Sequence, residues 1–231
     1  MNLVINPITG LLDRVNQVIK IYDAVVDITG GGDFTTVEAA VDAGHRTIFI
    51  KSGTYPFDNL LITKSGTILI GESKIDTILD AGGFNVHISD DGVSVINDVE
   101  IRNLSLINYD GGVSPEGIIQ PSEFTSGATG WIIDNCIFSG NATNLGADIH
   151  VKGSNMTITN NIFKSSIGIN FTAGTGDTII SGNYFFDSRI KTTGGAIGVS
   201  TASLFIKGNY FTFASAVAPS INILASRCMI S

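Results

Sequence analysis

Ile180-Ser-Gly-Asn-Tyr-Phe185 recurs in altered form at four other places in the chain, and this recurrence decides the fold. The related segments are Ile101-Arg-Asn-Leu-Ser-Leu106, Ile133-Asp-Asn-Cys-Ile-Phe138, Ile158-Thr-Asn-Asn-Ile-Phe163 and Ile206-Lys-Gly-Asn-Tyr-Phe211. Successive segments begin 22 to 32 residues apart, a period that is typical of chains wound into a solenoid. The sequence therefore predicts a repeating coil.

Each column of the repeat has a physical interpretation. The first position is always Ile and the last is Leu or Phe, as expected for strand residues that point into a common interior. The third position is Asn or Gly, the residues that best tolerate a left-handed backbone conformation. Two strands joined by such a bend, repeated along the chain, predict an all-β fold, a parallel β-helix in which like side chains stack coil upon coil. Asn residues stacked in this way can satisfy one another's amides.

A β-sandwich with Asn-rich turns is the alternative fold. Such a sandwich would not keep Ile, Asn or Gly, and Phe in register over five copies. The repeats therefore favour the β-helix.

The composition limits the classes of function. The chain has 231 residues with 27 glycines and 15% charged residues, which fits one elongated domain with many tight turns. Its net charge of −8 and the lack of a basic stripe argue against a nucleic-acid partner. The two cysteines, Cys136 and Cys228, are too few for a disulfide framework. No His/Cys spacing indicates a zinc site, and we expect no metal or other cofactor.

We also expect no membrane insertion, because the chain contains no apolar run long enough to span a bilayer. The first residues lack the basic start and apolar run of a secretory signal peptide. The chain is therefore expected to be made in a cytoplasm, wherever it finally works.

Two parts are expected along the chain. Residues 1–28 hold a turn signal and a short apolar-periodic stretch that is compatible with a helix, and we interpret them as an attachment or linker segment. Residues 29–231 are expected to form a single β-helix domain. That domain opens with an amphipathic helix at about residues 34–43, where Thr35 and Glu38 have the spacing of a capping box. The helix is expected to close the open end of the solenoid and to protect its strand edges.

The same region carries a resemblance to a known family. It lies in the run Gly32-Asp-Phe-Thr-Thr-Val-Glu-Ala-Ala-Val-Asp42, followed by Thr47-Ile-Phe-Ile-Lys-Ser-Gly-Thr-Tyr55, Ile68-Leu-Ile-Gly-Glu-Ser73 and Thr77-Ile-Leu-Asp80. This opening resembles that of right-handed β-helices of the pectate lyase superfamily, and more closely the variants found in tail spikes and other virion proteins of bacteriophages. Together with the five later repeats, the resemblance covers residues 30 to about 213.

The resemblance implies a right-handed parallel β-helix, but it does not carry over an activity. Pectin methylesterases of this superfamily need paired Asp, flanking Gln and an Arg. This chain has no Asp-Phe-Ile-Phe-Gly segment and no Arg-Pro-Trp segment, and its Gln120 is followed by Pro121. We therefore do not expect a pectin methylesterase.

Lyases and glycosidases need clustered acidic side chains, and the outward positions offer few of them. The weak catalytic candidates are Asp134, Asp148 beside His150, and Asp187. Hydrogen bonding within turns explains Asp residues of this kind equally well.

Apolar side chains form two outward stripes along the repeats. A soluble monomer rarely leaves so long an apolar strip in water, so we interpret the stripes as a subunit interface, most simply around a threefold axis. A platform on which sugar rings stack and a surface covered by loops are the alternatives. The stripes comprise Ile132, Ile137, Ile162, Ile179, Tyr184, Phe205 and Tyr210.

The coil that begins at Ile101 is about eight residues longer than its successors, and the surplus falls within residues 108–127. Insertions in solenoids emerge as loops on one face and often carry binding sites. A solvated loop without a function is the alternative. The candidate binding residues are Tyr109, Asp110, Glu116, Gln120 and Glu123.

These observations lead to one functional hypothesis and one alternative. The hypothesis is a stiff structural protein of a phage virion rather than an enzyme. It would be a homotrimeric tail-spike-like, fibre or decoration component that binds other virion proteins and a host surface polysaccharide. The alternative is a polysaccharide depolymerase, a lyase or a hydrolase, on the same scaffold. A cellular adhesin or an ice-binding surface protein would be expected to show a regular outward Thr array, which the repeats lack.

Overall fold

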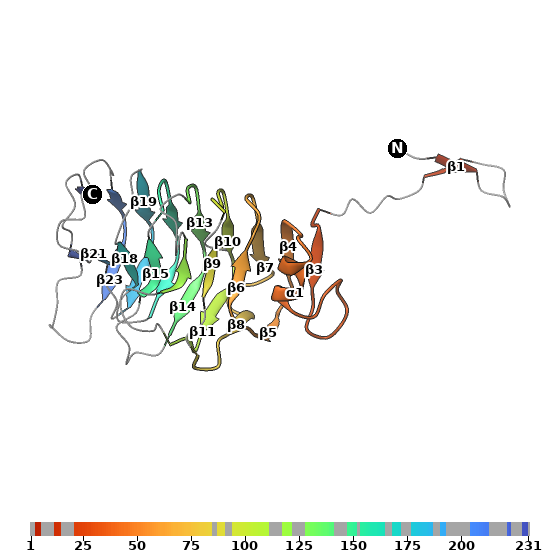
Figure 1. Cartoon of the computed structure of the whole chain (residues 1–231), viewed down its shortest axis with the longest axis horizontal. Coiled ribbons are helices and arrows are strands. Elements are labelled where there is room, and N and C mark those ends of the chain that lie inside the picture. Colours follow the sequence, from red (N-terminus) through yellow and green to blue (C-terminus); the bar gives the residue numbers. More distant parts are fainter. Residues whose placement is uncertain are drawn as a thin grey trace.

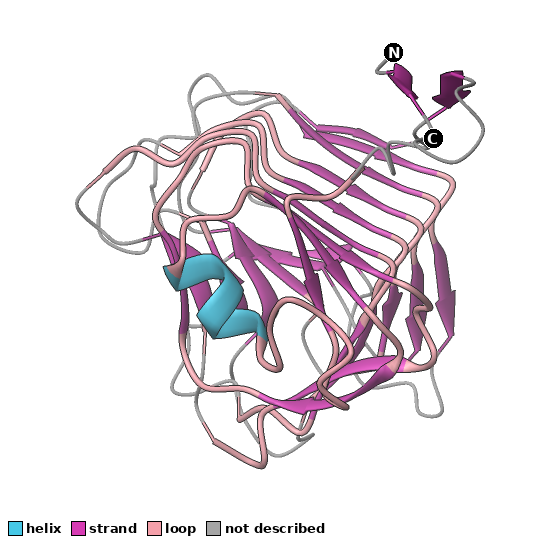
Figure 2. Ribbon diagram, turned by 90° about the vertical axis from the view of Figure 1, so that its right-hand side faces the viewer, coloured by secondary structure: helices cyan, strands magenta, loops and turns pink. Residues whose placement is uncertain are grey.

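The chain folds into a right-handed parallel β-helix whose three parallel sheets run side by side along one axis (Figures 1 and 2). This confirms the predicted fold class. The computed structural model describes residues 3–5, 12–14, 21–84, 87–90, 94–110, 117–121, 128–140, 147–151, 153–164, 168–171, 177–186, 190–192, 204–212, 221–222 and 228–230.

The first sheet contains the strand that carries the Ile position of each repeat. Its neighbouring strands pair in parallel, each with the corresponding strand of the next coil. In chain order it comprises β3 (Ala24–Val26), β4 (Thr47–Ile50), β7 (Ile68–Gly71), β10 (Glu100–Arg102), β13 (Ile132–Asp134), β16 (Thr157–Thr159), β19 (Thr178–Ser181), β22 (Leu204–Lys207) and β25 (Cys228–Ile230).

The second sheet contains the strand that follows the bend of each repeat. It is also parallel throughout, and it adjoins the first sheet at the bend. Its strands are β5 (Gly53–Pro56), β8 (Thr77–Asp80), β11 (Ser105–Ile107), β14 (Ile137–Ser139), β17 (Ile162–Phe163), β20 (Tyr184–Phe186) and β23 (Tyr210–Thr212).

The third sheet closes each coil, and the repeat pattern did not predict most of it. Residues 117–120, which fall within the expected long loop, form its third strand. Its strands are β6 (Leu60–Ile62), β9 (Ile88–Asp90), β12 (Gly117–Gln120), β15 (Ala147–Val151), β18 (Ile169–Phe171), β21 (Ile190–Thr192) and β24 (Ile221–Asn222).

The bend between the first and second sheets has the predicted left-handed backbone. Asn103, Asn135 and Asn160 have φ angles of 58°, 53° and 57°, and Gly182 and Gly208 in the same position have 64° and 58°. Because these residue types tolerate positive φ, the chain can turn the same sharp corner in every coil. This repeated corner keeps the two strands of each coil above those of the coil before.

The interior confirms the predicted single file of aromatic rings. Phe138, Phe163, Phe185 and Phe211 lie opposite one another in the paired strands. Their rings stack with centroid distances of 5.0, 4.7 and 4.6 Å between successive members. The first three are fully buried, and each ring packs against the ring of the neighbouring coil.

An asparagine ladder runs beside the aromatic stack, as predicted. Asn161 Nδ2 donates to Asn183 Oδ1 over 3.1 Å, and Asn183 Nδ2 donates to Asn209 Oδ1 over 3.0 Å. The same Oδ1 atoms also accept the backbone N–H groups of Asn161 and Asn183, at 2.9 Å each. Polar side chains can therefore fill core positions here because the neighbouring coil supplies their partners.

The helix α1 (Val37–Asp42) covers the N-terminal end of the β-helix, as predicted (Figure 2). It packs against β3, β4 and β6 and buries Val37, Ala40 and Val41. The predicted capping residue was wrong by one position: Thr36, and not Thr35, is the N-cap, and its Oγ1 accepts from the Ala39 N–H at 3.3 Å.

The N-terminal segment differs from the expectation in two respects. Its strands β1 (Leu3–Ile5) and β2 (Leu12–Arg14) form an antiparallel pair, so residues 12–14 are not helical. The strand β3 pairs in parallel with β4, which places the start of the β-helix before the boundary expected at residues 28 and 29.

Candidate functional site

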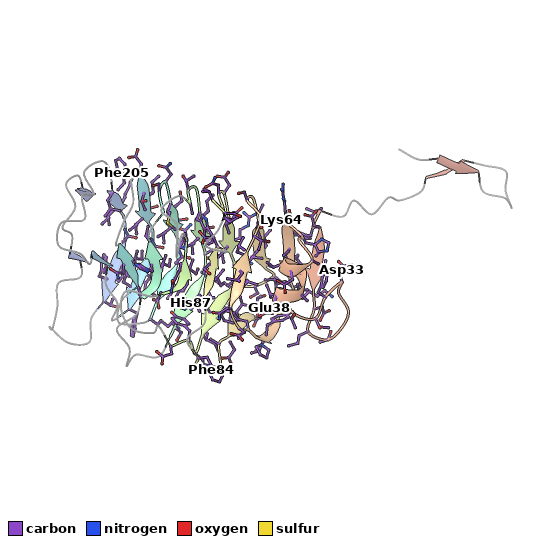
Figure 3. The ribbon with its side chains drawn as sticks, in the orientation of Figure 1. Asp33, Glu38, Lys64, Phe84, His87 and Phe205 are labelled. Atoms are coloured by element: carbon purple, nitrogen blue, oxygen red, sulfur yellow. The ribbon has the colours of Figure 1, made fainter. Side chains whose placement is uncertain are left out.

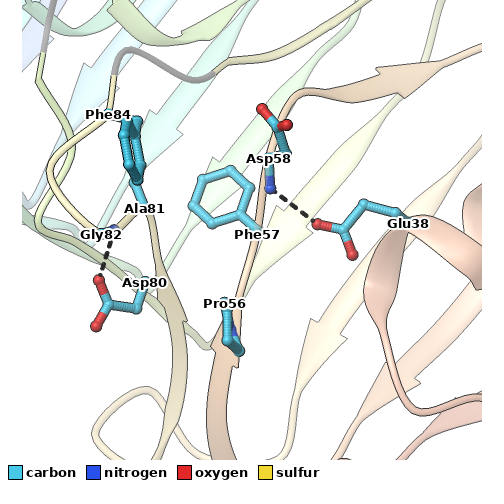
Figure 4. A pocket seen from close by; sticks show the side chains of 8 residues that line it. All are labelled: Glu38, Pro56, Phe57, Asp58, Asp80, Ala81, Gly82 and Phe84. Atoms are coloured by element: carbon cyan, nitrogen blue, oxygen red, sulfur yellow. Dashed lines mark hydrogen bonds between the residues drawn. The ribbon is translucent and has the colours of Figure 1, made fainter.

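A groove opens on the surface near the helix-capped end, where the second sheet turns into the third (Figure 4). It has a volume of about 710 Å³. Three segments form it: α1, the end of β5 with the turn after it, and the end of β8 with the turn after it. This corner groove is lined by Glu38, Pro56, Phe57, Asp58, Asp80, Ala81, Gly82 and Phe84.

Hydrogen bonds from backbone N–H groups and from one side-chain amide fix acidic side chains at the groove. The Asp58 N–H donates to Glu38 Oε1 at 3.2 Å, which ties the turn after β5 to α1. Asp80 Oδ1 accepts from the Gly82 N–H at 2.9 Å and from Asn108 Nδ2 at 3.0 Å. Gly82, with a φ of 62°, allows the tight turn that returns the chain toward Asp80. The carboxylates are therefore held by the fold.

The apolar part of the groove consists of two aromatic rings and a proline. Phe57 is buried, whereas Phe84 is 71% exposed, and Figure 4 shows that the two rings come from neighbouring segments of the groove wall. An exposed aromatic ring is an available stacking surface. Because acceptor oxygens flank this surface, the groove can hold a flat ligand with an apolar face and hydrogen-bond donors at its edge.

The predicted binding residues of the long coil lie in different environments. Asp110 is half-buried beside the groove, and its N–H donates to the Phe84 carbonyl at 2.9 Å. Tyr109 and Gln120 are buried, with 2% and 1% exposure, so neither side chain offers a contact to a ligand in solvent. Glu116 and Glu123 lie outside the described residues.

Tyr109 and Gln120 are buried because they hold neighbouring coils together. The Tyr109 hydroxyl donates to Asp148 Oδ1. Gln120 Nε2 donates to the Gly117 carbonyl at 2.7 Å and lies 2.8 Å from His87 Nδ1. Both side chains therefore have structural roles that the sequence did not indicate.

The predicted catalytic candidates do not form a catalytic pair. Asp134 is in β13 of the first sheet, where its Oδ1 accepts from Thr159 Oγ1 at 2.7 Å and from Asn160 Nδ2 at 2.8 Å. Asp148 is in β15 of the third sheet and is completely buried. Two carboxylates that act on one glycosidic bond must flank the same sugar, which these two do not. Asp187 lies outside the described residues.

The third sheet carries a buried layer of polar side chains that the sequence analysis largely missed. In β12 and β15 both faces of the strand are buried, so polar residues on the outer face are also enclosed. The only sequence signal was the pairing of Asp148 with His150. The layer comprises Ser89, Gln120, Asp148, His150 and Asn170.

The apolar stripes are aligned as predicted, on two adjoining sheets. On the first sheet, Ile132, Ile179 and Phe205 are in register, with Thr157 interrupting the row between the two isoleucines. Ile132 and Ile179 are 37% and 43% exposed. The stripe therefore presents apolar surface to solvent, although Phe205 is half-buried.

The stripe on the second sheet consists of Ile137, Ile162, Tyr184 and Tyr210 in register. The two tyrosine rings stack with a centroid distance of 5.2 Å. Tyr210 is 61% exposed, while the other three are half-buried. Stacking within the stripe thus covers part of its own surface.

Within the described ranges, no three His, Cys, Asp or Glu residues are placed to hold a metal ion. In the same part of the chain, no helix has both the length and the apolar character needed to cross a membrane.

The corner groove itself was missed by the sequence analysis. Its residues come from the first two coils, which precede the five regular repeats, and they meet only because turns of different length lie above one another. The available signal was Gly82-Gly-Phe84 directly after a strand, since an aromatic residue at the tip of a glycine turn has little chance of burial.

Comparison with known proteins gives matches among solved structures alone. No protein-family model matches the chain, and no curated protein is similar to it in sequence. The catalytic domain of a GH87 alpha-1,3-glucanase in complex with nigerose is similar with a TM-score of 0.56 and 18% identity, over 85% of this chain and 34% of that one. A pectin methylesterase from carrot is similar with a TM-score of 0.45 and 13% identity, over 91% and 88% of the two chains.

The chain thus spans about a third of the length of the glucanase domain that it matches. At 18% identity this similarity shows the fold alone. It agrees with the right-handed β-helix described above.

Proposed function

We propose that the chain is a stiff β-helical component of a bacteriophage particle, a tail-spike-like, fibre or decoration protein, whose corner groove binds a glycan of the host surface. The phage part of the proposal rests on the resemblance of residues 30–213 to virion β-helices. The binding part rests on the groove, and neither part depends on a catalytic residue.

The observation that carries the binding proposal is the exposed Phe84 ring above carboxylates held by the fold. Phe84 is 71% exposed, and Asp80 beside it is fixed by two hydrogen bonds through one of its oxygens. Sugar rings have an apolar face that stacks on aromatic rings and equatorial hydroxyls that donate to carboxylates. The groove offers both kinds of contact on one surface.

The test is binding of the purified chain to an array of bacterial surface glycans, followed by titration of the best ligand. Replacing Phe84 by Ala should weaken binding about tenfold, because an aromatic contact contributes roughly 1.5 kcal/mol and 1.4 kcal/mol corresponds to a factor of ten. Phe186→Ala is the matched control, since Phe186 is 50% exposed and is not in the groove. Equal effects of the two variants would contradict the proposed site.

A polysaccharide depolymerase is the second candidate, and the three carboxylates of the groove favour it. Glycosidases act with two carboxyl groups across a sugar ring. An assay for released reducing ends on the bound polysaccharide tests this candidate. If Asp58→Asn or Asp80→Asn abolishes the release of reducing ends while binding is retained, the groove is the active site of an enzyme. If only Asp134→Asn or Asp148→Asn abolishes the release, the catalytic residues are those predicted from the sequence.

The homotrimer is also a proposal, and it rests on the aligned apolar stripes. The large exposed side chains Ile132, Ile179 and Tyr210 lie on adjoining sheets along the coils. A symmetric oligomer would bury such stripes against copies of themselves. Light scattering should therefore give three times the chain mass, and Ile179→Lys with Tyr210→Lys should give a folded monomer. A wild-type monomer would remove this part of the proposal.

The virion assignment has its own test. Mass spectrometry of purified particles of a phage that encodes the chain should detect it in fixed stoichiometry to the tail or capsid proteins. Its absence from washed particles would contradict the assignment, even if the groove binds a glycan.

A further inference from the structure

The charges of the corner groove indicate which glycans it can take, given the binding function proposed above. Glu38, Asp58 and Asp80 line it, and the other five lining residues carry no charge. Within the described residues, none of these three carboxylates takes part in an ion pair. Among the described residues, the groove is therefore a negative site whose carboxylates are not paired with a cation.

The lysines of the same end of the molecule are engaged elsewhere. Lys51 Nζ lies 2.8 Å from Asp27 Oδ2. Lys64 Nζ donates to the Gly44 carbonyl and Lys74 Nζ to Asn135 Oδ1, each at 2.8 Å. None of the three lysines lines the groove, and Figure 3 shows Lys64 at the opposite edge of the molecule from Phe84. These lysines therefore do not pair with the carboxylates of the groove.

Each of the three carboxylates also keeps an oxygen available to a ligand. Glu38 uses Oε1 to accept from the Asp58 N–H, Asp58 uses Oδ1 to accept from the Asn59 N–H, and Asp80 uses Oδ1 for both of its donors. The second oxygen of each has no donor among the described residues. A ligand that brings strong donors would satisfy all three.

We infer that the corner groove recognises a glycan bearing amino groups, binds neutral chains less tightly and rejects acidic ones such as polyuronates. A protonated amine offers three donors and a positive charge to the carboxylates. The exposed face of Phe84 attracts the same cation through its ring quadrupole. A uronic acid in that position would bring a fourth negative charge next to the three fixed ones.

The experiment compares oligosaccharides of one backbone and length that differ in charge. Chitosan oligosaccharides carry amines, cello-oligosaccharides are neutral, and cello-oligosaccharides oxidised at the primary alcohol carry carboxylates. Calorimetric titration at about pH 6 and low salt should give affinities in that order. The differences should shrink at high salt, because ionic screening weakens interactions between exposed charges.

Charge-neutral variants assign the preference to the groove. Each of Glu38→Gln, Asp58→Asn and Asp80→Asn should reduce the ratio of amino to neutral affinity by about threefold, the effect of one exposed charge pair. Asp42→Asn is the matched control: Asp42 is exposed on the same helix as Glu38 and does not line the groove. It should leave the ratio unchanged, which separates the groove from the net charge of −8.

Two further outcomes separate this inference from the proposed function. If the carboxylated chain binds as tightly as the aminated one, or if Asp42→Asn acts as strongly as the groove variants, the inference is overturned while glycan binding stands. If none of the three oligosaccharides binds in calorimetry, no glycan of the array binds, and Phe84→Ala changes nothing, the proposed function fails. The inference then fails with it.

Discussion

At the residue scale, the interior asparagines show how a polar side chain becomes a core residue. Asn183 donates to the Ile158 carbonyl at 2.8 Å, and its Oδ1 accepts both the backbone and the side chain of Asn161. A buried amide without such partners would cost free energy. The parallel register removes this cost, because the partner of each Asn is the same residue in the next coil.

Removing one member of the ladder should therefore cost more than one hydrogen bond. Asn183→Ala leaves the buried Asn161 N–H without its acceptor and is expected to lower the free energy of unfolding by about 2–4 kcal/mol. Urea denaturation measures this change. Asn160→Gly, which removes an exposed amide where the next two coils have glycine, should change it by less than about 1 kcal/mol; similar effects of both variants would show that the ladder is not stabilising.

A second residue-scale feature is the ion pair at the capped end. Lys51 Nζ, at 2.8 Å, and the Thr29 hydroxyl and N–H all donate to Asp27. The Lys51 contact is the main cause that lowers the pKa of Asp27 to about 2. A carboxylate whose pKa falls on folding stabilises the folded state above its unfolded pKa of about 4. This contribution is lost as the pH falls toward 2.

The expected result is a pH-dependent difference between the wild type and Asp27→Asn. Above about pH 4 the wild type should melt at a higher temperature than the variant, because it retains the ionised contact. Between about pH 4 and pH 2 the difference should shrink as Asp27 gains a proton. Thermal melts followed by circular dichroism at several pH values measure it, and a difference independent of pH would contradict the assigned pKa.

At the scale of the element, α1 shows why a local pattern can be displaced by a tertiary contact. Thr35 and Glu38 have the spacing of a capping box, but Glu38 accepts from the Asp58 N–H and so joins the helix to the next turn. The N-cap moves to Thr36, which has an extended backbone and accepts from the Ala39 N–H. The Asp58 N–H and the Ala39 N–H therefore both have an acceptor, in Glu38 and Thr36. The spacing of Thr35 and Glu38 alone identifies neither contact.

The pair of threonines gives a direct test of this assignment. Thr36→Ala should destabilise the protein by about 1 kcal/mol, the usual contribution of an N-cap, while Thr35→Ala should have an effect below about 0.5 kcal/mol. Guanidinium denaturation of both variants distinguishes the two positions. A larger loss from Thr35→Ala would restore the capping residue predicted from the sequence.

The elements differ in how far the sequence predicts them. Strands with one buried face, such as β10 and β16, alternate polar and apolar residues, and their register could be predicted together with the Asn and Gly bends. The third sheet could not, because Ala147–Val151 is buried on both faces and includes polar residues. The corner groove could not be predicted either, because Glu38, Asp58 and Phe84 come together only when turns of unequal length stack.

At the scale of the whole molecule, stability is a sum over neighbouring coils. Phe163 lies between two rings, at 5.0 and 4.7 Å, whereas Phe211 is half-buried and stacks on Phe185 at 4.6 Å. In repeat proteins each unit contacts only its neighbours, so a central position contributes through two interfaces. The same chemical change should thus have different effects along the axis.

Truncation of the two rings tests this expectation. Phe163→Ala should lower the free energy of unfolding by about 3–5 kcal/mol, as is usual for a buried phenylalanine. Phe211→Ala should cost roughly half as much, because less of its surface is buried. Equilibrium urea unfolding compares them, and equal losses would mean that the coils do not act as separate units.

The constant register of the sheets limits how the β-helix can gain or lose length. Ile158 and Ile180 occupy equivalent positions in adjacent coils, as do Thr157 and Ile179. Excision of residues 158–179 would join equivalent points and shorten the rod by one strand spacing, about 4.8 Å, and tandem duplication of the same segment would lengthen it by that amount. Deletion of an odd number of residues within a strand would shift inward residues outward, whereas the turns already differ in length between coils. Changes in the length of this rod should therefore proceed in whole coils.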